Sequence, residues 1–206
     1  MIQELFVDPN RCIGCRACVQ ACSECPEHDG RSMIHLDWLE RATTVQTAPT
    51  VCMHCAEPSC AAVCPTDAIK IDPEGVVLSA LQERCIGCGN CAVACPFGVP
   101  QIDLAQALMR KCDLCYDRTS VGKKPMCATV CPSGALFYGT HEEVTDLRRA
   151  RPQSRFVFGD ETLRTRNSLM VPLAVDTIVV GAFDGDAQGA ALPRTPAEQH
   201  LEEALW

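Results

Sequence analysis

The sequence has few aromatic residues, no excess of basic residues and no apolar run long enough to cross a membrane. Phe, Trp and Tyr make up 5% of the 206 residues, and the formal net charge is −8. Nucleic acid is a poor partner for an acidic chain, because neutralising phosphates requires basic patches. The most apolar run, residues 169–183, is shorter than the about 20 residues of a membrane span and contains Pro172 and Asp176. We therefore expect a core segment there, no membrane span and no nucleic-acid partner.

Motifs of bond-making catalysis are also absent. The sequence contains no nucleophile elbow, no phosphate-binding loop and no dinucleotide fingerprint. Its first residues, MIQELFVDPNRC, lack the basic start, apolar stretch and twin arginine of export signals. We therefore expect a chain that is not an enzyme by itself and that stays in the cytoplasm.

Cysteine is far more frequent than usual, with 17 residues. In a reducing cytosol such cysteines serve metal binding rather than disulfides. Sixteen of them form four groups that each end in Cys-x3-Cys. The groups are Cys12, Cys15, Cys18 and Cys22; Cys52, Cys55, Cys60 and Cys64; Cys85, Cys88, Cys91 and Cys95; and Cys112, Cys115, Cys127 and Cys131.

The spacing within the groups indicates iron–sulfur clusters. The first and third groups have the pattern C-x2-C-x2-C-x3-C, and the second, third and fourth groups are each followed by a proline, at Pro65, Pro96 and Pro132. In bacterial two-cluster ferredoxins this pattern holds [4Fe-4S] clusters, and the fourth cysteine binds the other cluster. Zinc ribbons use pairs of pairs instead. A structural zinc protein remains as an alternative, which iron analysis distinguishes.

A fifth cysteine, Cys25, follows the first group. Cys22 keeps the four-residue step found at the end of every group, whereas Cys25 lies three residues further on and is followed by Pro26. We therefore predict that Cys22 is a ligand and that Cys25 is a free thiol close to a cluster.

Short secondary-structure elements are expected between the groups. Alternating apolar residues predict β-hairpins at 33–47 and 68–78 and strands at 135–139 and 155–159. The last five residues of each group fit about one helical turn. Thr140 with Glu143 and Thr195 with Glu198 match capping boxes, which predict helices over 140–150 and in the tail.

In these motifs the chain resembles a known family, the four-cluster electron-transfer (beta) subunits of molybdopterin oxidoreductases. These include dimethyl sulfoxide reductase, formate dehydrogenase and polysulfide reductase types. The order of spacings matches, as do the stretches CMHCAEPSCAAVCPTDAI, CIGCGNCAVACPFGVPQID and RKCDLCYDRTSVGKKPMCATVCPSGALFYG, and the resemblance covers residues 5–140.

The resemblance implies four [4Fe-4S] clusters, because in this family the first group pairs with the fourth and the second with the third. The implied ligand sets are Cys12, Cys15, Cys18 and Cys131; Cys22, Cys112, Cys115 and Cys127; Cys52, Cys55, Cys60 and Cys95; and Cys64, Cys85, Cys88 and Cys91.

The implied fold class is α+β, with two ferredoxin-like 2[4Fe-4S] modules packed together, short β-hairpins, short helices and a C-terminal extension. The module of groups one and four is expected at 1–25 and 105–140, and that of groups two and three at 48–104. A hairpin insert is expected at 26–47, the extension at 141–183, and a linker with a terminal helix arm at 184–206.

The resemblance also implies partners. The chain would relay single electrons between a large catalytic subunit and a second electron donor or acceptor subunit. The catalytic subunit would be of molybdopterin type or, alternatively, a hydrogenase. The second subunit would be either membrane-bound or free of the membrane. A free-standing polyferredoxin is the competing hypothesis. Relatives of this kind are also exported with a signal-bearing partner, so the periplasm is the alternative compartment.

Several residues near the expected ligands keep two interpretations. Basic residues beside the ligands either raise cluster potentials or are surface charges: Arg11, Arg16, Arg84, Arg110 and Lys111. His54, between two cysteines, either donates to cluster sulfur or is a packed histidine. His35 and Trp38 either pack in the hairpin core or contact a partner. The tail with Leu201, Leu205 and Trp206 is either an arm that binds another subunit or a frayed end.

Overall fold

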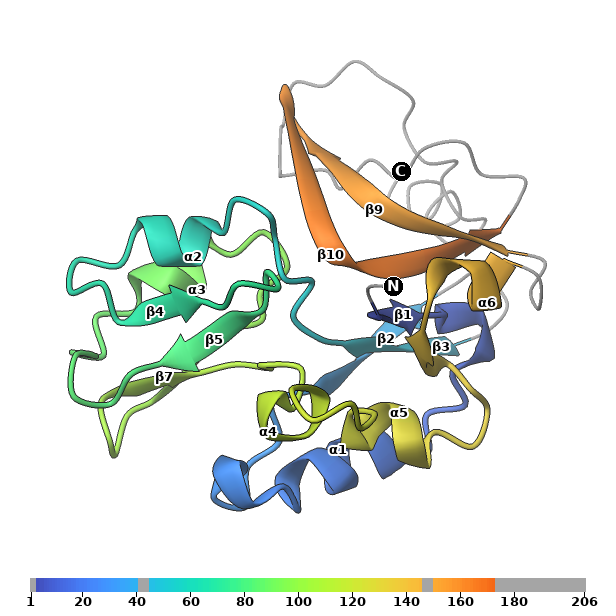
Figure 1. Cartoon of the computed structure of the whole chain (residues 1–206), viewed down its shortest axis with the longest axis horizontal. Coiled ribbons are helices and arrows are strands. Elements are labelled where there is room, and N and C mark those ends of the chain that lie inside the picture. The colour runs from blue at the N-terminus through green and yellow to red at the C-terminus, as the bar shows by residue number, and fades with distance from the viewer. Residues whose placement is uncertain (1–2, 41–44, 146–149, 173–206) are drawn as a thin grey trace, which may run out of the picture.

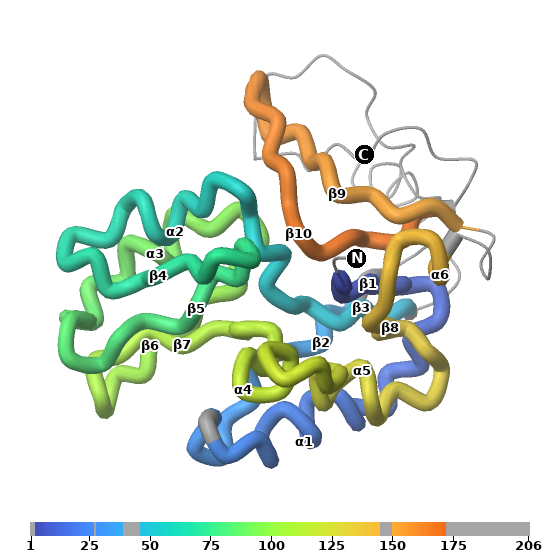
Figure 2. The backbone as a smooth tube through the Cα atoms, in the orientation of Figure 1, coloured from blue at the N-terminus to red at the C-terminus, as the bar shows by residue number. Residues whose placement is uncertain are grey.

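A computed structural model describes residues 3–40, 45–145 and 150–172 of the chain. In Figures 1 and 2, the short helices and hairpins of residues 59–110 lie on one side, and a larger sheet with the helices of the first and last cysteine groups lies on the other. The expected linker and terminal arm at 184–206, with the capping box of Thr195 and Glu198, lie outside the described residues.

A four-stranded sheet joins the two ends of the described chain. Its strands are β1 (Glu4–Val7), β8 (Leu136–Gly139), β9 (Ala150–Phe158) and β10 (Glu161–Pro172). The order is β8-β1-β10-β9, in which β1 is antiparallel to β8 and parallel to β10. The pairing of β10 with β9 shifts register between Arg164 and Leu169. Residues 150–172 therefore belong to the same sheet as the N-terminal strand.

Three two-stranded hairpins complete the β structure of the described residues. They are β2 (His35–Glu40) with β3 (Val45–Thr50), β4 (Ile69–Ile71) with β5 (Val77–Ala80), and β6 (Gln101–Asp103) with β7 (Leu108–Arg110). The first two confirm the predicted hairpins, and the third was not predicted. In the β4–β5 turn the Asp72 carboxylate accepts the N–H groups of Glu74 and Val76, which is the usual role of Asp in a turn.

The end of each cysteine group is a short helix, as predicted. These helices are α1 (Ala17–Ser23), α2 (Ser59–Ala62), α3 (Asn90–Ala94) and α5 (Met126–Val130). Each one carries the third cysteine of its group on its buried side: Cys18, Cys60, Cys91 and Cys127. The other short helices of the described residues are η1 (Pro9–Arg11), η2 (Pro26–His28), α4 (Tyr116–Thr119) and α6 (His141–Thr145).

The segment after β8 differs in part from expectation. The predicted capping box is confirmed, because Thr140 N–H donates to Glu143 Oε2 at 2.8 Å and Glu143 N–H donates to Thr140 Oγ1 at 3.4 Å. The prediction of a helix through residue 150 is wrong at its end. Ala150 begins β9, where it pairs with Pro172 of β10, so pairing between strands decides its conformation. The strand expected from residue 155 consequently begins at Ala150.

Cysteines form part of both main hydrophobic clusters. One cluster combines Leu5, Val7 and Tyr138 of the sheet with Cys22 and Cys127. The other combines Ile69, Val77 and Met109 of the hairpins with Cys60 and Cys91. In the apolar run after residue 169, Met170 and Val171 are buried in β10, which confirms a core segment for its described part. Within the described residues, no helix is long and apolar enough to cross a membrane.

Candidate functional site

Two cavities are each lined by four cysteines. The first is lined by Cys64, Cys85, Cys88 and Cys91. The second is lined by Cys12, Cys15, Cys18 and Cys131. In each cavity three cysteines come from one group and the fourth ends another group. Figure 1 shows the helices beside them, α2 and α3 for the first cavity and α1 and α5 for the second, in different parts of the molecule.

The remaining eight grouped cysteines include buried thiols that repel one another. Burial raises the pKa of Cys55 to about 12, with added repulsion from Cys52, Cys95 and Cys60. Burial also raises the pKa of Cys127 well above its ordinary value, with repulsion from Cys112, Cys115, Cys22 and Cys18. Thiolates repel strongly only at close range. The two cavities thus bring together two of the four sets that the resemblance implies, whereas repulsion links Cys112 to Cys52 as well as to Cys22.

One backbone turn recurs at the start of all four groups. The residue before the second cysteine has a left-handed conformation in each: Gly14 (φ 68°), His54 (φ 49°), Gly87 (φ 64°) and Leu114 (φ 66°). This region favours glycine, because a Cβ crowds the backbone there. At Gly87 a Cβ would also lie 3.0 Å from the Ala107 backbone. The repeated turn curls each loop around its set of thiols.

Backbone N–H groups point at the sulfur atoms. The donors and acceptors are Met33 to Cys22 (3.2 Å), Ala68 to Cys64 (3.3 Å), Met109 to Cys85 (3.4 Å) and Leu136 to Cys131 (3.4 Å). The hydroxyl of Thr47 donates to Cys12 Sγ at 3.1 Å. Such donors stabilise thiolates, and they tune the potential of a metal cluster that the thiolates bind.

The second cysteine loop is held by strand β10. Asn167 is fully buried, accepts from Leu5 N–H at 3.2 Å and donates from Nδ2 to the carbonyl of Cys52 at 2.8 Å. The backbone of residues 164–167 adds hydrogen bonds to the carbonyls of Met53 and His54 and to the N–H of Ala56. The segment expected to be a C-terminal extension therefore satisfies the backbone of a candidate ligand loop.

Lys111 is buried, not on the surface. Its side chain is 1% exposed, and Nζ donates to the carbonyls of Val77 and Cys112, at 3.0 Å for the latter. Burial raises the pKa of Cys52, and the positive charge of Lys111 opposes that rise. Lys111 thus bonds the backbone of one candidate ligand, Cys112, and its charge acts on another, Cys52.

The other basic residues expected near ligands are at the surface or paired. Arg11 and Arg16 are exposed, and Arg84 is an exposed partner of Asp67 at 3.3 Å. Arg110 is mostly buried and pairs with Asp29. In the insert hairpin, Trp38 is 60% exposed, so core packing is wrong for this residue.

His54 is a fully buried, packed histidine with one free donor. Its Nδ1 accepts from Val77 N–H at 3.0 Å, and burial together with Lys111 and Arg166 holds its pKa well below the ordinary value. The neutral ring therefore carries its proton on Nε2. That atom is buried and has no hydrogen-bond partner among the residues that the structure describes. Sulfide of a cluster held by the flanking Cys52 and Cys55 would supply an acceptor of the kind it lacks.

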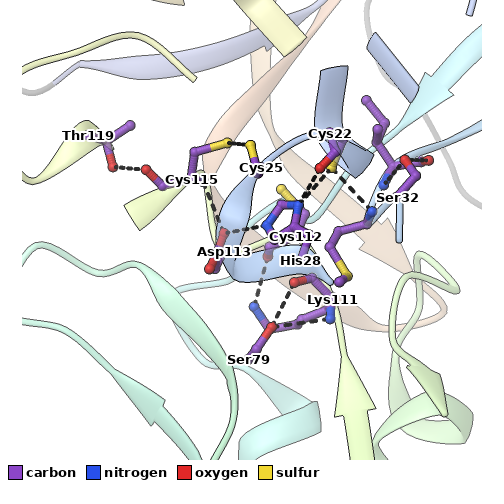
Figure 3. Close-up of polar contacts among 12 residues, drawn as sticks. Cys22, Cys25, His28, Ser32, Ser79, Lys111, Cys112, Asp113, Cys115 and Thr119 are labelled. Atoms are coloured by element: carbon purple, nitrogen blue, oxygen red, sulfur yellow. Dashed lines mark hydrogen bonds and ion pairs between the residues drawn. The ribbon is translucent and has the colours of Figure 1, made fainter. Parts of the chain in front are cut away.

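A polar cluster surrounds Cys22 (Figure 3). His28 Nδ1 lies 3.4 Å from Cys22 Sγ and 2.6 Å from its carbonyl, and Nε2 lies 3.8 Å from Asp113 Oδ1. Burial would raise the pKa of Cys22, but the hydrogen bonds of His28 and Met33 lower it overall. Cys25 lies in the same cluster and is buried.

These residues fit a metal cluster better than a single ion. Within the described ranges, no three His, Cys, Asp or Glu side chains converge as ligands of one metal ion. The donor set of four thiolates is that of [4Fe-4S] clusters.

Comparison with known proteins decides the family. A model of 4Fe-4S dicluster domains matches residues 43–141, and a model of 4Fe-4S binding domains matches residues 4–24. The protein is 36% identical over 170 residues to the B subunit of anaerobic dimethyl sulfoxide reductase of Escherichia coli, covering 74% of this sequence and 82% of that protein. The chain belongs to this family of iron–sulfur subunits.

Formate dehydrogenase subunits are similar too. The nitrate-inducible iron–sulfur subunit of Escherichia coli is 33% identical over 178 residues, which cover 71% of this chain and 57% of that protein. The iron–sulfur subunit of Haemophilus influenzae is 35% identical over 163 residues, 68% of this chain and 52% of that protein. This iron–sulfur subunit thus spans little more than half of its formate dehydrogenase relatives. The expectation of a [4Fe-4S]-binding iron–sulfur subunit of this type is confirmed, and the mixture of short helices and strands agrees with the expected α+β class.

Proposed function

We propose that this subunit relays single electrons between the catalytic subunit of a molybdopterin oxidoreductase and a second redox partner. Its sixteen grouped cysteines would hold four [4Fe-4S] clusters in the four sets of the candidate site. When bound, each cluster supplies a one-electron redox couple. The protein holds the thiolates in place and donates hydrogen bonds to them.

The convergence of the cysteine groups carries this proposal. Cys131 lines one cavity with Cys12, Cys15 and Cys18, and Cys64 lines the other with the first three cysteines of the third group. The exchange of one cysteine between groups is the arrangement of two-cluster ferredoxins. It supports two ferredoxin-like modules, 1–25 with 105–140 and 48–104, packed together.

The exposed cysteines support two contact points for partners. Cys15 and Cys88 are exposed, and the adjoining Ile13 and Ile86 are 66% and 60% exposed. Each pair belongs to one of the two cavities. A partner that covers such an apolar rim excludes water and brings its own redox centre close. Buried Lys111, which contacts Cys112 and acts on Cys52, would balance part of the negative charge of these thiolates.

Metal analysis of the native complex tests the proposal. We expect about sixteen iron and sixteen sulfide per chain, as four cubanes require, in a complex whose large subunit contains molybdenum or tungsten. Nickel in that large subunit would indicate the hydrogenase alternative. A chain that purifies alone with full iron would indicate a polyferredoxin, and zinc in place of iron would overturn the proposal.

A further inference from the structure

Cys25 is a buried thiol that faces another cysteine. It is 4% exposed and precedes η2, where its carbonyl accepts from His28 N–H at 2.9 Å. Its Sγ lies 3.7 Å from the carbonyl of Ala21 and 3.9 Å from Cys115 Sγ (Figure 3). The thiol is therefore directed at one particular candidate ligand.

The sulfur–sulfur distance has a chemical meaning. Two thiolates bound to one tetrahedral metal at about 2.3 Å lie about 3.8 Å from each other. Cys25 and Cys115 Sγ, at 3.9 Å, are already at the separation from which both sulfurs reach the same metal atom. A disulfide requires about 2.05 Å instead.

The backbone around both cysteines is fixed, so the approach is built into the fold. Cys25 N–H donates to the carbonyl of Cys22 at 3.3 Å, in the turn that follows α1. Cys115 has a left-handed backbone, φ 49°, and its N–H donates to Asp113 Oδ1 at 3.0 Å.

We propose that Cys25 is a reserve ligand that replaces Cys115 in the cluster site of Cys22, Cys112, Cys115 and Cys127. In the exchange, the Cys25 S–H bond breaks and an S–Fe bond forms, while the Cys115–Fe bond breaks and Cys115 takes up the proton. No electron is gained or lost. The inference rests on the proposed function, because it takes Cys115 as a ligand.

Iron and sulfide content of four variants tests the exchange. Cys25→Ala keeps about sixteen iron per chain, as the unaltered chain does, because its ligand sets are complete. Cys115→Ala also keeps about sixteen, since Cys25 takes the vacant position, and the low-temperature EPR spectrum of the reduced protein changes. The double variant Cys25→Ala/Cys115→Ala loses about four iron, the content of one cluster.

Cys127→Ala is the matched control. Cys127 belongs to the same set but is not the cysteine that Cys25 faces, so this variant loses about four iron. If Cys127→Ala loses iron and Cys115→Ala loses as much, the reserve role is overturned while the ligand assignment stands. If Cys127→Ala keeps all its iron, the ligand assignment itself is wrong. Cys115→Ser repeats the test with a second substitution. If both Cys115 variants lose iron that Cys25→Ala retains, the reserve role is also contradicted.

Discussion

The guanidinium of Arg110 donates a hydrogen bond to the carboxylate of Asp29, 81 residues earlier, at 2.7 Å. A second ion pair joins the same two segments with the charges reversed, between Arg31 and Asp103. Arg110 and Asp103 belong to the β6–β7 hairpin, whereas Asp29 and Arg31 follow η2. The two pairs therefore fasten the loop after the first cysteine group to the hairpin between the third and fourth groups.

Replacing Arg31 with glutamine is expected to lower the melting temperature at neutral pH. The hydrogen bond from Arg31 and the N–H of Ala105 hold the pKa of Asp103 below its ordinary value. A carboxylate with a depressed pKa stabilises the fold above its unfolded pKa, about 4, and loses that contribution as the pH falls through the folded value. The difference in melting temperature between variant and parent is therefore largest above about pH 4 and disappears in stronger acid.

The control for this prediction is Arg84→Gln. Arg84 also pairs with a carboxylate, but its side chain is 49% exposed and that of Asp67 is 69% exposed. Exposed pairs contribute little. The measurement is the melting temperature of both variants across the acid range. Equal losses of melting temperature in Arg31→Gln and Arg84→Gln would contradict a special role for the buried carboxylate of Asp103.

Replacing Asn167 with alanine is expected to destabilise the second cysteine loop. It leaves the N–H of Leu5 and the carbonyl of Cys52 without their partner, at a cost on the order of 1–3 kcal/mol for each buried group. Denaturant unfolding and iron content measure the effect. Ser168→Ala is the control, because Ser168 Oγ has a single long contact, 3.4 Å, with Glu4. Similar losses in both variants would show that Asn167 does not hold the loop.

Replacing Gly87 with alanine is expected to cost more than the same change at Gly75. Both glycines have positive φ, 64° and 85°, so both variants lose about 1–2 kcal/mol to the left-handed backbone. A Cβ at Gly87 also meets Ala107 at 3.0 Å, whereas at Gly75 it meets nothing within 4 Å. The difference in unfolding free energy isolates the contact. Equal losses of unfolding free energy in the two variants would mean that the loop of Gly87 moves away from Ala107 without cost.

Replacing Lys111 with methionine is expected to lower the reduction potential of the clusters beside it. A positive charge near thiolate ligands favours the reduced, more negative state, and the buried site amplifies the effect. Potentiometric titration followed by EPR measures the shift. Lys70→Met removes a half-exposed lysine that pairs with Asp67, so its potentials stay at the parent values. If the reduction potentials of Lys111→Met equal those of the parent, Lys111 contributes to the fold and does not tune the clusters.

The four cysteine groups followed from spacing, because the number of residues between cysteines limits which of them share a loop, whereas the pairing of the groups was implied by the family resemblance. The short helices and the capping box of Thr140 followed for the same local reason. Other features depend on contacts distant in sequence. His54 and Leu114 occupy the same left-handed turn as Gly14 and Gly87, yet only glycine signals such a turn. The burial of Lys111 could not be predicted, because it depends on β5, whose Val77 carbonyl accepts from the ammonium group.

The pairing of β1 with β10 also bears on how the protein is made. The loop at 52–56 takes its hydrogen-bond partners from residues 164–167, and Cys12 shares a cavity with Cys131. Neither site is complete while the C-terminal half is still on the ribosome. The cavity of Cys64, Cys85, Cys88 and Cys91, in contrast, takes all its cysteines from residues 64–91.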